Sequence, residues 1–254
     1  MARRVPEGPP PPPVVQRVRL RYAKRGRLRF TSHRDFARAF ERALRRAQVP
    51  MAYSAGFSPH PKISYVGAAP TGVASEAEYL EIGLARVIDV DELRAAIDAA
   101  LPPGLDIIEA VPAGPGSLAE RMHASVWRVE LPGVRSQELA VALTAFLAHE
   151  QYGVQRLTKD GRRTIDARSP VLVAAVSRAE TPLDPPRAIL ELVVRQVTPA
   201  VRPDDVLAAL RAVAGLAPVS PPVAVRVAQG PLDDAGAVGD PLAPDRITAG
   251  LPPE

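Results

Sequence analysis

The sequence predicts an α+β protein of two halves, each with the ferredoxin-like order β-α-β-β-α-β. Segments of alternating apolar residues are separated by stretches with an apolar residue every three or four positions, and this series occurs twice in 254 residues. We expect a proline-rich, disordered tail at residues 1–14, an N-terminal half at 15–113, a C-terminal half at 119–228 and a second disordered tail at 229–254. Both sheets are expected to be antiparallel.

The first predicted strand has one basic face and one apolar face. Apolar and basic residues alternate through it: Val18, Leu20 and Tyr22 against Arg17, Arg19 and Arg21. We expect Leu28 and Phe30 to extend this strand or to return along it.

A helix is predicted to begin near Ser32. Ser32 and Asp35 have the spacing of a capping box, and Pro50 ends the helical pattern. The apolar stripe of this helix consists of Phe36, Phe40, Leu44 and Ala47.

The rest of the N-terminal half completes the order. An extended segment at 51–53 leads into a long loop, and a helix capped by Asp89 ends at Pro102-Pro103-Gly104. Further strands are predicted at 63–66, 80–84 and 105–111.

The C-terminal half repeats this logic with one surplus strand, so we expect a decorated version, joined to the first half near 114–118. Helices are predicted over 139–147 and from Pro203 onward. The turn Lys159-Asp160-Gly161 predicts a hairpin. The strands are expected at 125–131, 154–158, 162–166, 171–176, 189–197 and 223–227.

Composition excludes several classes of chemistry. There are no cysteines, which excludes disulfides, thiolate zinc sites, cysteine nucleophiles and cysteine-ligated iron–sulfur clusters on this chain. No P-loop, dinucleotide fingerprint or nucleophile elbow is present, and we expect no cofactor. The most apolar stretch, 139–148, is too short to span a membrane, and no signal peptide is evident. We therefore expect a soluble cytoplasmic protein.

Charge is distributed unevenly along the chain. Residues 17–46 contain twelve Arg or Lys and two acids, so this block carries +10 while the whole chain carries +4. Such separation indicates an anionic partner. A compositional bias toward arginine explains why Arg is preferred to Lys, but it does not explain why acids avoid the block.

Seven arginines are candidates for binding phosphate, because the planar guanidinium contacts phosphate oxygens in pairs. Four share one face of the first predicted helix, and three share the basic strand face. They are Arg34, Arg38, Arg42 and Arg45 on the helix, and Arg17, Arg19 and Arg21 on the strand. The alternative is an ordinary solvated helix face.

The loop at 54–62 is the second candidate. Gly56 permits unusual backbone angles, and prolines flank His60. Phe57 is placed to stack on a base and Lys62 to meet a phosphate. The alternative is a structural loop with Phe57 in the core.

Two weaker hypotheses concern histidines and a hairpin. His33 and His60 could form a general acid/base pair for metal-independent RNA cleavage, although a histidine at a helix start is more often a polar packing residue. The sequence shows no third ligand to accompany these two histidines, so it gives no indication of a metal site.

A second basic cluster would extend the anion-binding surface, or would belong to a hairpin with a salt bridge to Asp166. It comprises Lys159, Arg162, Arg163 and Arg168.

Two motifs resemble an uncharacterised bacterial family described as radical-SAM-associated or radical-SAM-linked. One includes Ser32-His33-Arg34-Asp35 in the run that starts at Lys24, and the other is Gly56-Phe57-Ser58-Pro59-His60-Pro61-Lys62. The segments 75–79 and 164–168 are also similar, and the resemblance covers about residues 15–225. It implies a separately encoded accessory chain, because a radical SAM cluster needs three cysteines. The catalytic partner would be a radical SAM protein, and many such proteins modify RNA.

The leading expectation is a non-catalytic accessory protein that binds RNA and works with a radical SAM enzyme. A metal-independent ribonuclease using His33 and His60 is one alternative, and a protein–protein adaptor is another.

Overall fold

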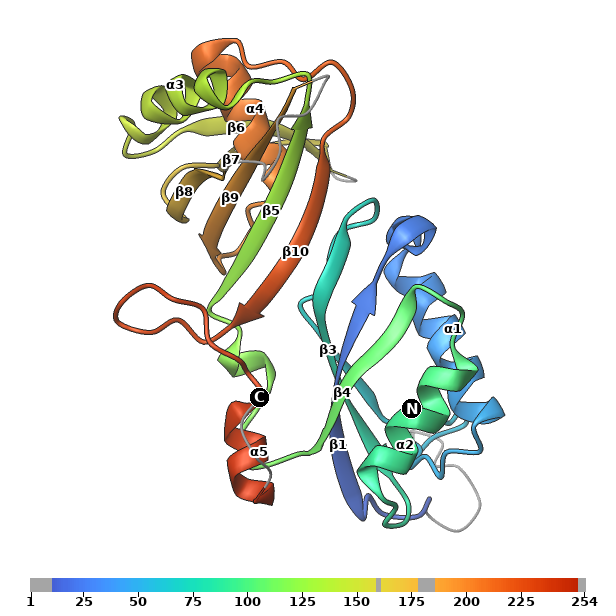
Figure 1. Ribbon diagram of the computed structural model, residues 1–254. Coiled ribbons are helices and arrows are strands. Elements are labelled where there is room, and N and C mark those ends of the chain that lie inside the picture. Colours follow the sequence, from blue (N-terminus) through green and yellow to red (C-terminus); the bar gives the residue numbers. More distant parts are fainter. Residues whose placement is uncertain (1–10, 159–160, 178–185, 251–254) are drawn as a thin grey trace, which may run out of the picture. The chain divides into compact units, whose positions relative to one another are not determined.

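The structure is a computed structural model that describes residues 11–158, 161–177 and 186–250 (Figure 1). Within these residues it contains five α-helices and ten strands, which confirms the α+β class. The chain divides into two compact units, one formed by residues 1–120 with 241–254 and the other by residues 121–240.

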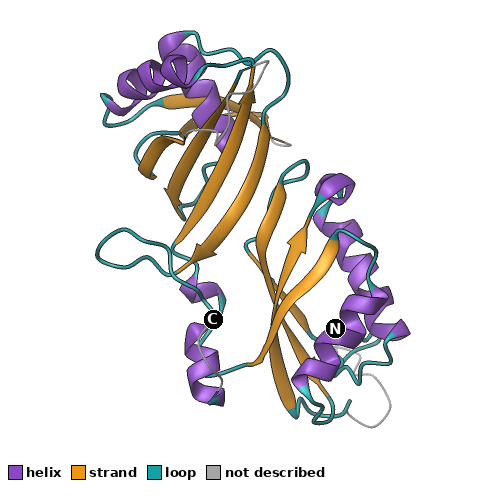
Figure 2. Ribbon diagram, viewed as in Figure 1, coloured by secondary structure: helices purple, strands orange, loops and turns teal. Residues whose placement is uncertain are grey.

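The first unit has one antiparallel sheet in the order β4-β1-β3-β2. Figure 2 shows the strands in orange and the helices in purple. Val18 at the centre pairs with Ile82 of β3 and Pro112 of β4. The elements are β1 (Gln16–Lys24), α1 (His33–Arg46), β2 (Ile63–Val66), β3 (Ala74–Leu84), α2 (Val90–Ala100) and β4 (Leu105–Pro112).

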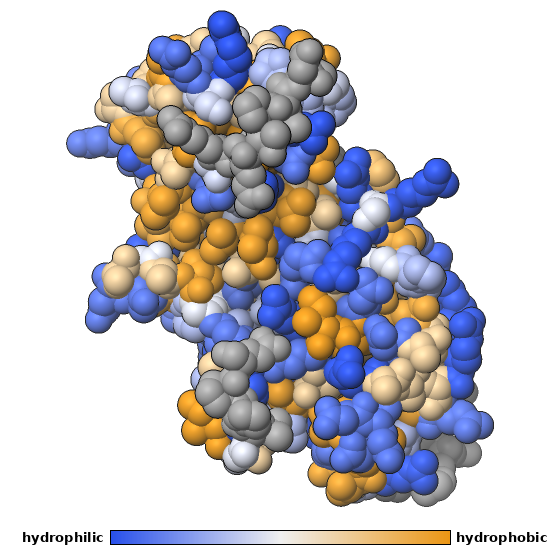
Figure 3. Space-filling view, viewed as in Figure 1, coloured by the Kyte–Doolittle hydropathy of each residue, from blue (hydrophilic) through white to orange (hydrophobic). Residues whose placement is uncertain are grey.

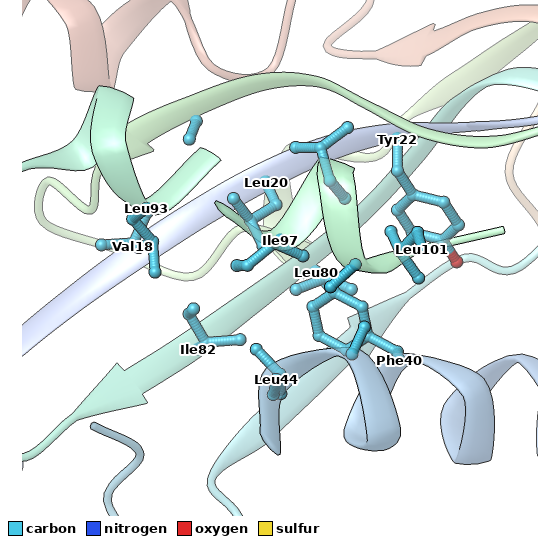
Figure 4. Packing of buried hydrophobic residues seen from close by; sticks show 14 of the residues in the cluster. Val18, Leu20, Tyr22, Phe40, Leu44, Leu80, Ile82, Leu93, Ile97 and Leu101 are labelled. Carbon is cyan, nitrogen blue, oxygen red and sulfur yellow. The ribbon is translucent and has the colours of Figure 1, made fainter. Parts of the chain in front are cut away.

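The core of this unit lies between the sheet and the two helices α1 and α2. Strand alternation places one apolar row of β1 on this face, and the predicted stripe of α1 packs against it. Burying several such side chains stabilises the fold by about 1.5–3 kcal/mol each. Figure 4 shows Val18, Leu20, Tyr22, Phe40, Leu44, Leu80, Ile82, Leu93, Ile97 and Leu101 in this cluster.

Both helices of the first unit begin where the sequence indicates. The Ser32 hydroxyl accepts a hydrogen bond from the Asp35 amide at 3.2 Å, as expected of a helix N-cap. The Asp89 carboxylate caps α2 by accepting from the amides of Asp91 and Glu92. Hydrogen bonds from these capping side chains therefore set the residue at which each helix begins.

The segment after β1 differs from expectation. Leu28 and Phe30 do not extend a strand; they belong to the 3₁₀ helix η1 (Gly26–Phe30). Gly26 has φ +54°, a left-handed conformation that turns the chain away from the strand direction. Leu28 then packs against the core while Phe30 stays exposed. Residues 51–53 form isolated bridges rather than a strand.

The second unit has an antiparallel sheet in the order β10-β5-β9-β8, with the hairpin β6-β7 as a separate two-stranded sheet. Both strands of this hairpin are additional to the β-α-β-β-α-β order, whereas the sequence analysis expected one surplus strand. The elements are β5 (Ala124–Pro132), α3 (Ser136–Leu147), β6 (Gly153–Thr158), β7 (Gly161–Asp166), β8 (Val171–Ser177), β9 (Arg187–Arg195), α4 (Pro203–Ala214) and β10 (Val223–Gly230).

The chain after β10 also differs from expectation. Instead of a disordered tail, it forms the helix α5 (Ala243–Ala249), which belongs to the first unit. Asp245 is 0% exposed and Arg246 is 7% exposed. Buried polar pairing, not apolar periodicity, holds this helix, so the sequence pattern did not indicate it. Of the expected tails at 1–14 and 229–254, residues 1–10 and 251–254 lie outside the described residues.

Candidate nucleic-acid interface

The strand arginines and the helix arginines lie on opposite faces of the first sheet. In β1, Arg19 and Arg21 alternate with the core residues Leu20 and Tyr22, so they point away from α1 and α2. Arg19 is opposite Glu81 of β3 in the register. The seven predicted arginines therefore do not form one continuous track.

Arg19 is a structural residue rather than an accessible one. It is 1% exposed, and its guanidinium pairs with Glu81 at 3.0 Å and with Asp245 of α5 at 2.7 Å. Asp245 also accepts from the Gly114 amide at 2.9 Å. Arg17 pairs with the same Glu81 at 3.0 Å. Arg19 is therefore not available to an external anion as the sequence suggested, since two protein carboxylates and the Gly116 carbonyl already occupy its donors.

Acids that are distant in sequence neutralise other members of the basic block. Arg25 pairs with Glu76 and, at 2.9 Å, with Asp106. Arg21 donates to the Glu76 backbone carbonyl at 3.0 Å. The scarcity of acids within 17–46 therefore overstates the positive charge of the folded surface.

The arginines of α1 have a different environment. Arg34, Arg38 and Arg42 are exposed, and in the part of the chain that the structure describes none of them forms an ion pair or a side-chain hydrogen bond. Arg45 lies 3.9 Å from Glu41, a loose contact worth little at a surface. The right-hand margin of Figure 3, over α1, is strongly hydrophilic. This exposed face of α1 (Arg34, Arg38, Arg42 and Arg45) is called the arginine face below.

The position of α1 is set by contacts with β2. The ring of Tyr65 in β2 lies edge-on to His33 at 4.9 Å and to Phe36 at 6.0 Å. On its other flank, Arg46 donates to the Ala100 carbonyl at the end of α2. Helix α1 therefore covers the margin of the sheet that ends in β2, and its arginine face points away from the core.

The Tyr65 phenol stays protonated in this setting. Burial, followed by the nearby charge of Glu41, raises the pKa of Tyr65 above its usual value. Its hydroxyl is buried without a hydrogen-bond partner among the described residues. Tyr65 thus acts as an apolar support for α1 rather than as an acid or base.

The loop before β2 (Ser54–His60, the proline loop below) is closed at its neck. The Ser54 amide donates to the His60 carbonyl at 2.9 Å, and the His60 amide donates to the Ser54 hydroxyl at 3.0 Å. Gly56 has φ +135°, and Phe57 at the tip is 71% exposed. Phe57 therefore does not fill the core. Lys62, directly before β2, is exposed as well.

His33 and His60 are placed at opposite ends of β2. His33 contacts Tyr65, which is opposite Leu80, whereas the carbonyl of Lys62 accepts from Gly83. Three residues of β3 separate these two points, or about 10 Å along the strand. The His60 loop extends further still. The contacts of the two imidazoles give no support to an acid/base pair.

Only some residues of the predicted second basic cluster are exposed. Arg162 and Arg163 of β7 are exposed, and Lys159 lies outside the described residues. Arg168 donates to the Val171 carbonyl at 3.1 Å and lies over the Phe146 ring at 5.8 Å, so its guanidinium takes part in packing.

Asp166 turns the chain after this hairpin. It accepts from the amides of Tyr152 and Arg168 at 3.0 Å and from Ser169. Burial alone would raise the pKa of Asp166, but these hydrogen bonds outweigh it and lower the pKa below the ordinary value. The expected salt bridge is replaced by hydrogen bonds to backbone amides.

Two exposed residues beside the arginine face were not predicted as site residues. Arg27 is exposed in η1, and Phe30 is 59% exposed. Phe30 directly precedes Thr31 and Ser32, the residues that lead into α1. Because Phe30 lies outside the apolar stripe of that helix, its position was the available signal that the ring is exposed. The alternation of Leu28 and Phe30 favoured a strand instead and concealed it.

The described part of the chain holds no group of three histidine, aspartate or glutamate side chains able to bind a metal ion. Across the same residues, no helix has the length and apolar character needed to cross a membrane.

These observations define a two-unit α+β protein whose first unit carries an exposed arginine face beside a closed proline loop, and three of the four arginines of this face form no ion pair among the described residues. The chain belongs to the DUF2344 family, described as uncharacterized proteins conserved in bacteria, whose family model matches residues 17–203. That match includes β1 from Arg17 onward, α1 and the proline loop. No curated protein matches the sequence.

Proposed function

We propose that this protein binds RNA through the arginine face of α1 and the neighbouring proline loop, as a non-catalytic accessory of a radical SAM enzyme. One observation carries the RNA-binding part: Arg34, Arg38 and Arg42 project from a single helix face with no ion pair among the described residues. Arginines elsewhere in the basic block, such as Arg19 and Arg25, are paired with acids. The unpaired members therefore remain available for phosphate.

Helix geometry suits this role. Residues four apart on a helix are separated by about 6 Å along the axis, so Arg34, Arg38 and Arg42 form an evenly spaced row. Each guanidinium can contact a phosphate with two donors. Binding would release counterions from the nucleic acid and would therefore weaken as salt rises.

The radical SAM part rests on the motif resemblance around Ser32-His33-Arg34-Asp35 and the proline loop. The chain has no cysteine, so it cannot ligate the cluster of such an enzyme through thiolates. A separately encoded catalytic chain would supply that chemistry, and this protein would hold the RNA.

We also infer that both units are variants of the ferredoxin-like arrangement. The first unit has strand order β4-β1-β3-β2, and the second has β10-β5-β9-β8. Counting strands within each unit, and leaving the β6-β7 hairpin out of the second, both orders read fourth, first, third, second. The hairpin is then an insertion between the first helix and the second strand of the second unit.

A double charge reversal tests the RNA interface. Arg38→Glu with Arg42→Glu should lower RNA affinity at least about tenfold and reduce the slope of log affinity against log salt by about 0.7 to 1 per arginine. Fluorescence anisotropy with a labelled RNA over a salt series measures both quantities. The matched control, Arg86→Glu with Arg211→Glu, changes the net charge equally at exposed positions that are not part of α1. Equal affinity for both double variants would refute the proposal.

Partner capture separates the accessory role from a protein adaptor. We expect the separately encoded radical SAM protein to co-purify with this chain, and RNA to co-purify with both. If nuclease treatment leaves a protein bound to the arginine face, and Arg38→Glu with Arg42→Glu releases it, that face docks protein rather than RNA.

A further inference from the structure

Two phenylalanine rings of the first unit are exposed to solvent. Phe30 is 59% exposed and Phe57 is 71% exposed, whereas Phe36, Phe40 and Phe146 are buried. Both exposed rings lie in the segments that flank α1 in sequence. Large apolar side chains are usually buried, and an aromatic ring that stays exposed offers a flat face on which a base can stack.

The Phe30 ring is held in place from one side. The Arg29 guanidinium lies over it, with 4.7 Å between the guanidinium carbon and the ring centroid. The backbone there is fixed by hydrogen bonds from the Gly72 amide to the Arg29 carbonyl at 2.8 Å and from the Thr31 amide to the Leu28 carbonyl at 2.9 Å. Phe30 therefore presents an oriented ring, with one face covered by a cation.

The Phe57 ring is carried by the proline loop, whose neck is closed between Ser54 and His60. A second tie, from the Lys62 amide to the Ala52 carbonyl at 2.8 Å, joins the two stems of the loop. Because these bonds limit the freedom of the loop, less entropy is lost when Phe57 contacts a ligand.

The two rings bracket the arginine face. Phe30 adjoins the β2–β3 connection through Gly72, at the end of β2 where His33 contacts Tyr65. Phe57 lies before the other end of β2. Between these ends runs α1, on which Arg34 and Arg42 are about 12 Å apart along the axis. An aromatic ring thus lies beyond each end of a row of cations.

We propose that the RNA bound by this face is single-stranded, with unpaired bases stacked on Phe30 and Phe57 and the intervening phosphates held by the α1 arginines. This inference rests on the proposed function. In a duplex the base faces are already stacked on their neighbours and are closed to a side chain, whereas a single strand can turn its bases onto aromatic rings. Stacking on a ring tolerates any base, so the site selects strand state more than sequence.

Anisotropy with one labelled RNA, free and annealed to its complement, tests the inference. We expect tighter binding of the single strand, and a loss of on the order of 5- to 100-fold in single-strand affinity for Phe30→Ala or Phe57→Ala, with duplex affinity unchanged. Phe57→Trp should keep the affinity. Val87→Ala is the matched control, an exposed apolar residue of the same unit, 73% exposed. A 2-aminopurine base in the RNA reports stacking directly, through fluorescence quenching that Phe57→Ala removes.

The outcomes separate this inference from the function beneath it. If the Ala variants bind like the parent, or if the duplex binds as well as the single strand, while Arg38→Glu with Arg42→Glu still loses RNA, the stacking inference is overturned and RNA binding stands. If the arginine reversal has no effect, the proposed function itself fails. If the Ala variants lose a protein partner and keep RNA, the rings form a protein contact and the inference is overturned.

Discussion

Arg19 and Arg38 have the same side chain and belong to the same basic block, but the fold gives them opposite environments. Arg19 is 1% exposed between Glu81 and Asp245, whereas Arg38 is exposed on α1. Pairing with two carboxylates offsets the cost of burying a charge, which is large for an unpaired ion. The charge of a residue therefore does not show by itself whether it contacts a ligand. The groups with which each guanidinium already pairs show whether it is available.

The Arg19–Asp245 pair should be sensitive to loss of one member. Asp245→Ala leaves a buried arginine with Glu81 as its remaining carboxylate partner and the Gly116 carbonyl as its other acceptor, and we expect the unfolding free energy to fall by about 3–5 kcal/mol. Replacing both, as Arg19→Met with Asp245→Leu, should recover much of the loss because no buried charge is stranded. Urea unfolding of Arg19→Met, of Asp245→Leu and of the double variant measures this coupling. Additive effects of the two substitutions would show that the pair is not coupled.

Asp166 gives a prediction about pH. Its folded-state pKa lies below the ordinary value of 3.8, so its hydrogen bonds stabilise the native state above about pH 4. That stability is lost as pH falls through the lowered pKa. Asp166→Asn should therefore lower the melting temperature at pH 7, and the difference from the parent should shrink below pH 4. A difference that stays constant from pH 7 to pH 3 would contradict this account.

At the scale of elements, α1 depends on its first turn. Ser32 accepts from the Asp35 amide at 3.2 Å and its hydroxyl donates to the Asp35 carboxylate at 2.7 Å. Ser32→Ala should cost about 1 kcal/mol of stability, whereas Ser32→Asp should cost less because aspartate also caps helices. Thermal unfolding distinguishes the two. Equal losses would mean that the cap contributes little to α1.

Most elements could be predicted from sequence because each has a local signal. Strand alternation indicated β1, the Ser32 and Asp89 caps indicated α1 and α2, and Pro203 indicated α4. The segment η1 was missed, since Leu28 and Phe30 alternate like strand residues while Gly26 redirects the backbone. Helix α5 was missed because tertiary ion pairs hold it. The strand arginines were assigned to the site although their alternation with core residues already placed them opposite α1.

At the scale of the molecule, the first unit is completed by residues distant in sequence. Acids from β3, from β4 and from α5 neutralise arginines of β1 and the segment after it. The sequence block carries +10, but several of these charges are internally compensated. The uncompensated positive charge that could attract a partner is concentrated on α1. The proposed anion-binding surface is therefore one face of this helix and not the whole basic block.

Removing α5 should therefore affect the sheet more than the arginine face. Truncation after Asp240 deletes Asp245 and Arg246, whose partners Arg19 and Glu109 lie on β1 and β4. Those two buried or partly buried charges would then face water or stay unpaired, so local opening of the strands should become easier. Amide hydrogen exchange in the full and truncated chains measures this, and we expect faster exchange in β1 and β4 with little change in α3 and α4 of the second unit. Unchanged exchange in β1 and β4 would show that α5 is dispensable. RNA affinity that persists in the truncated chain would be consistent with a binding surface on α1 that does not require the α5 ion pairs.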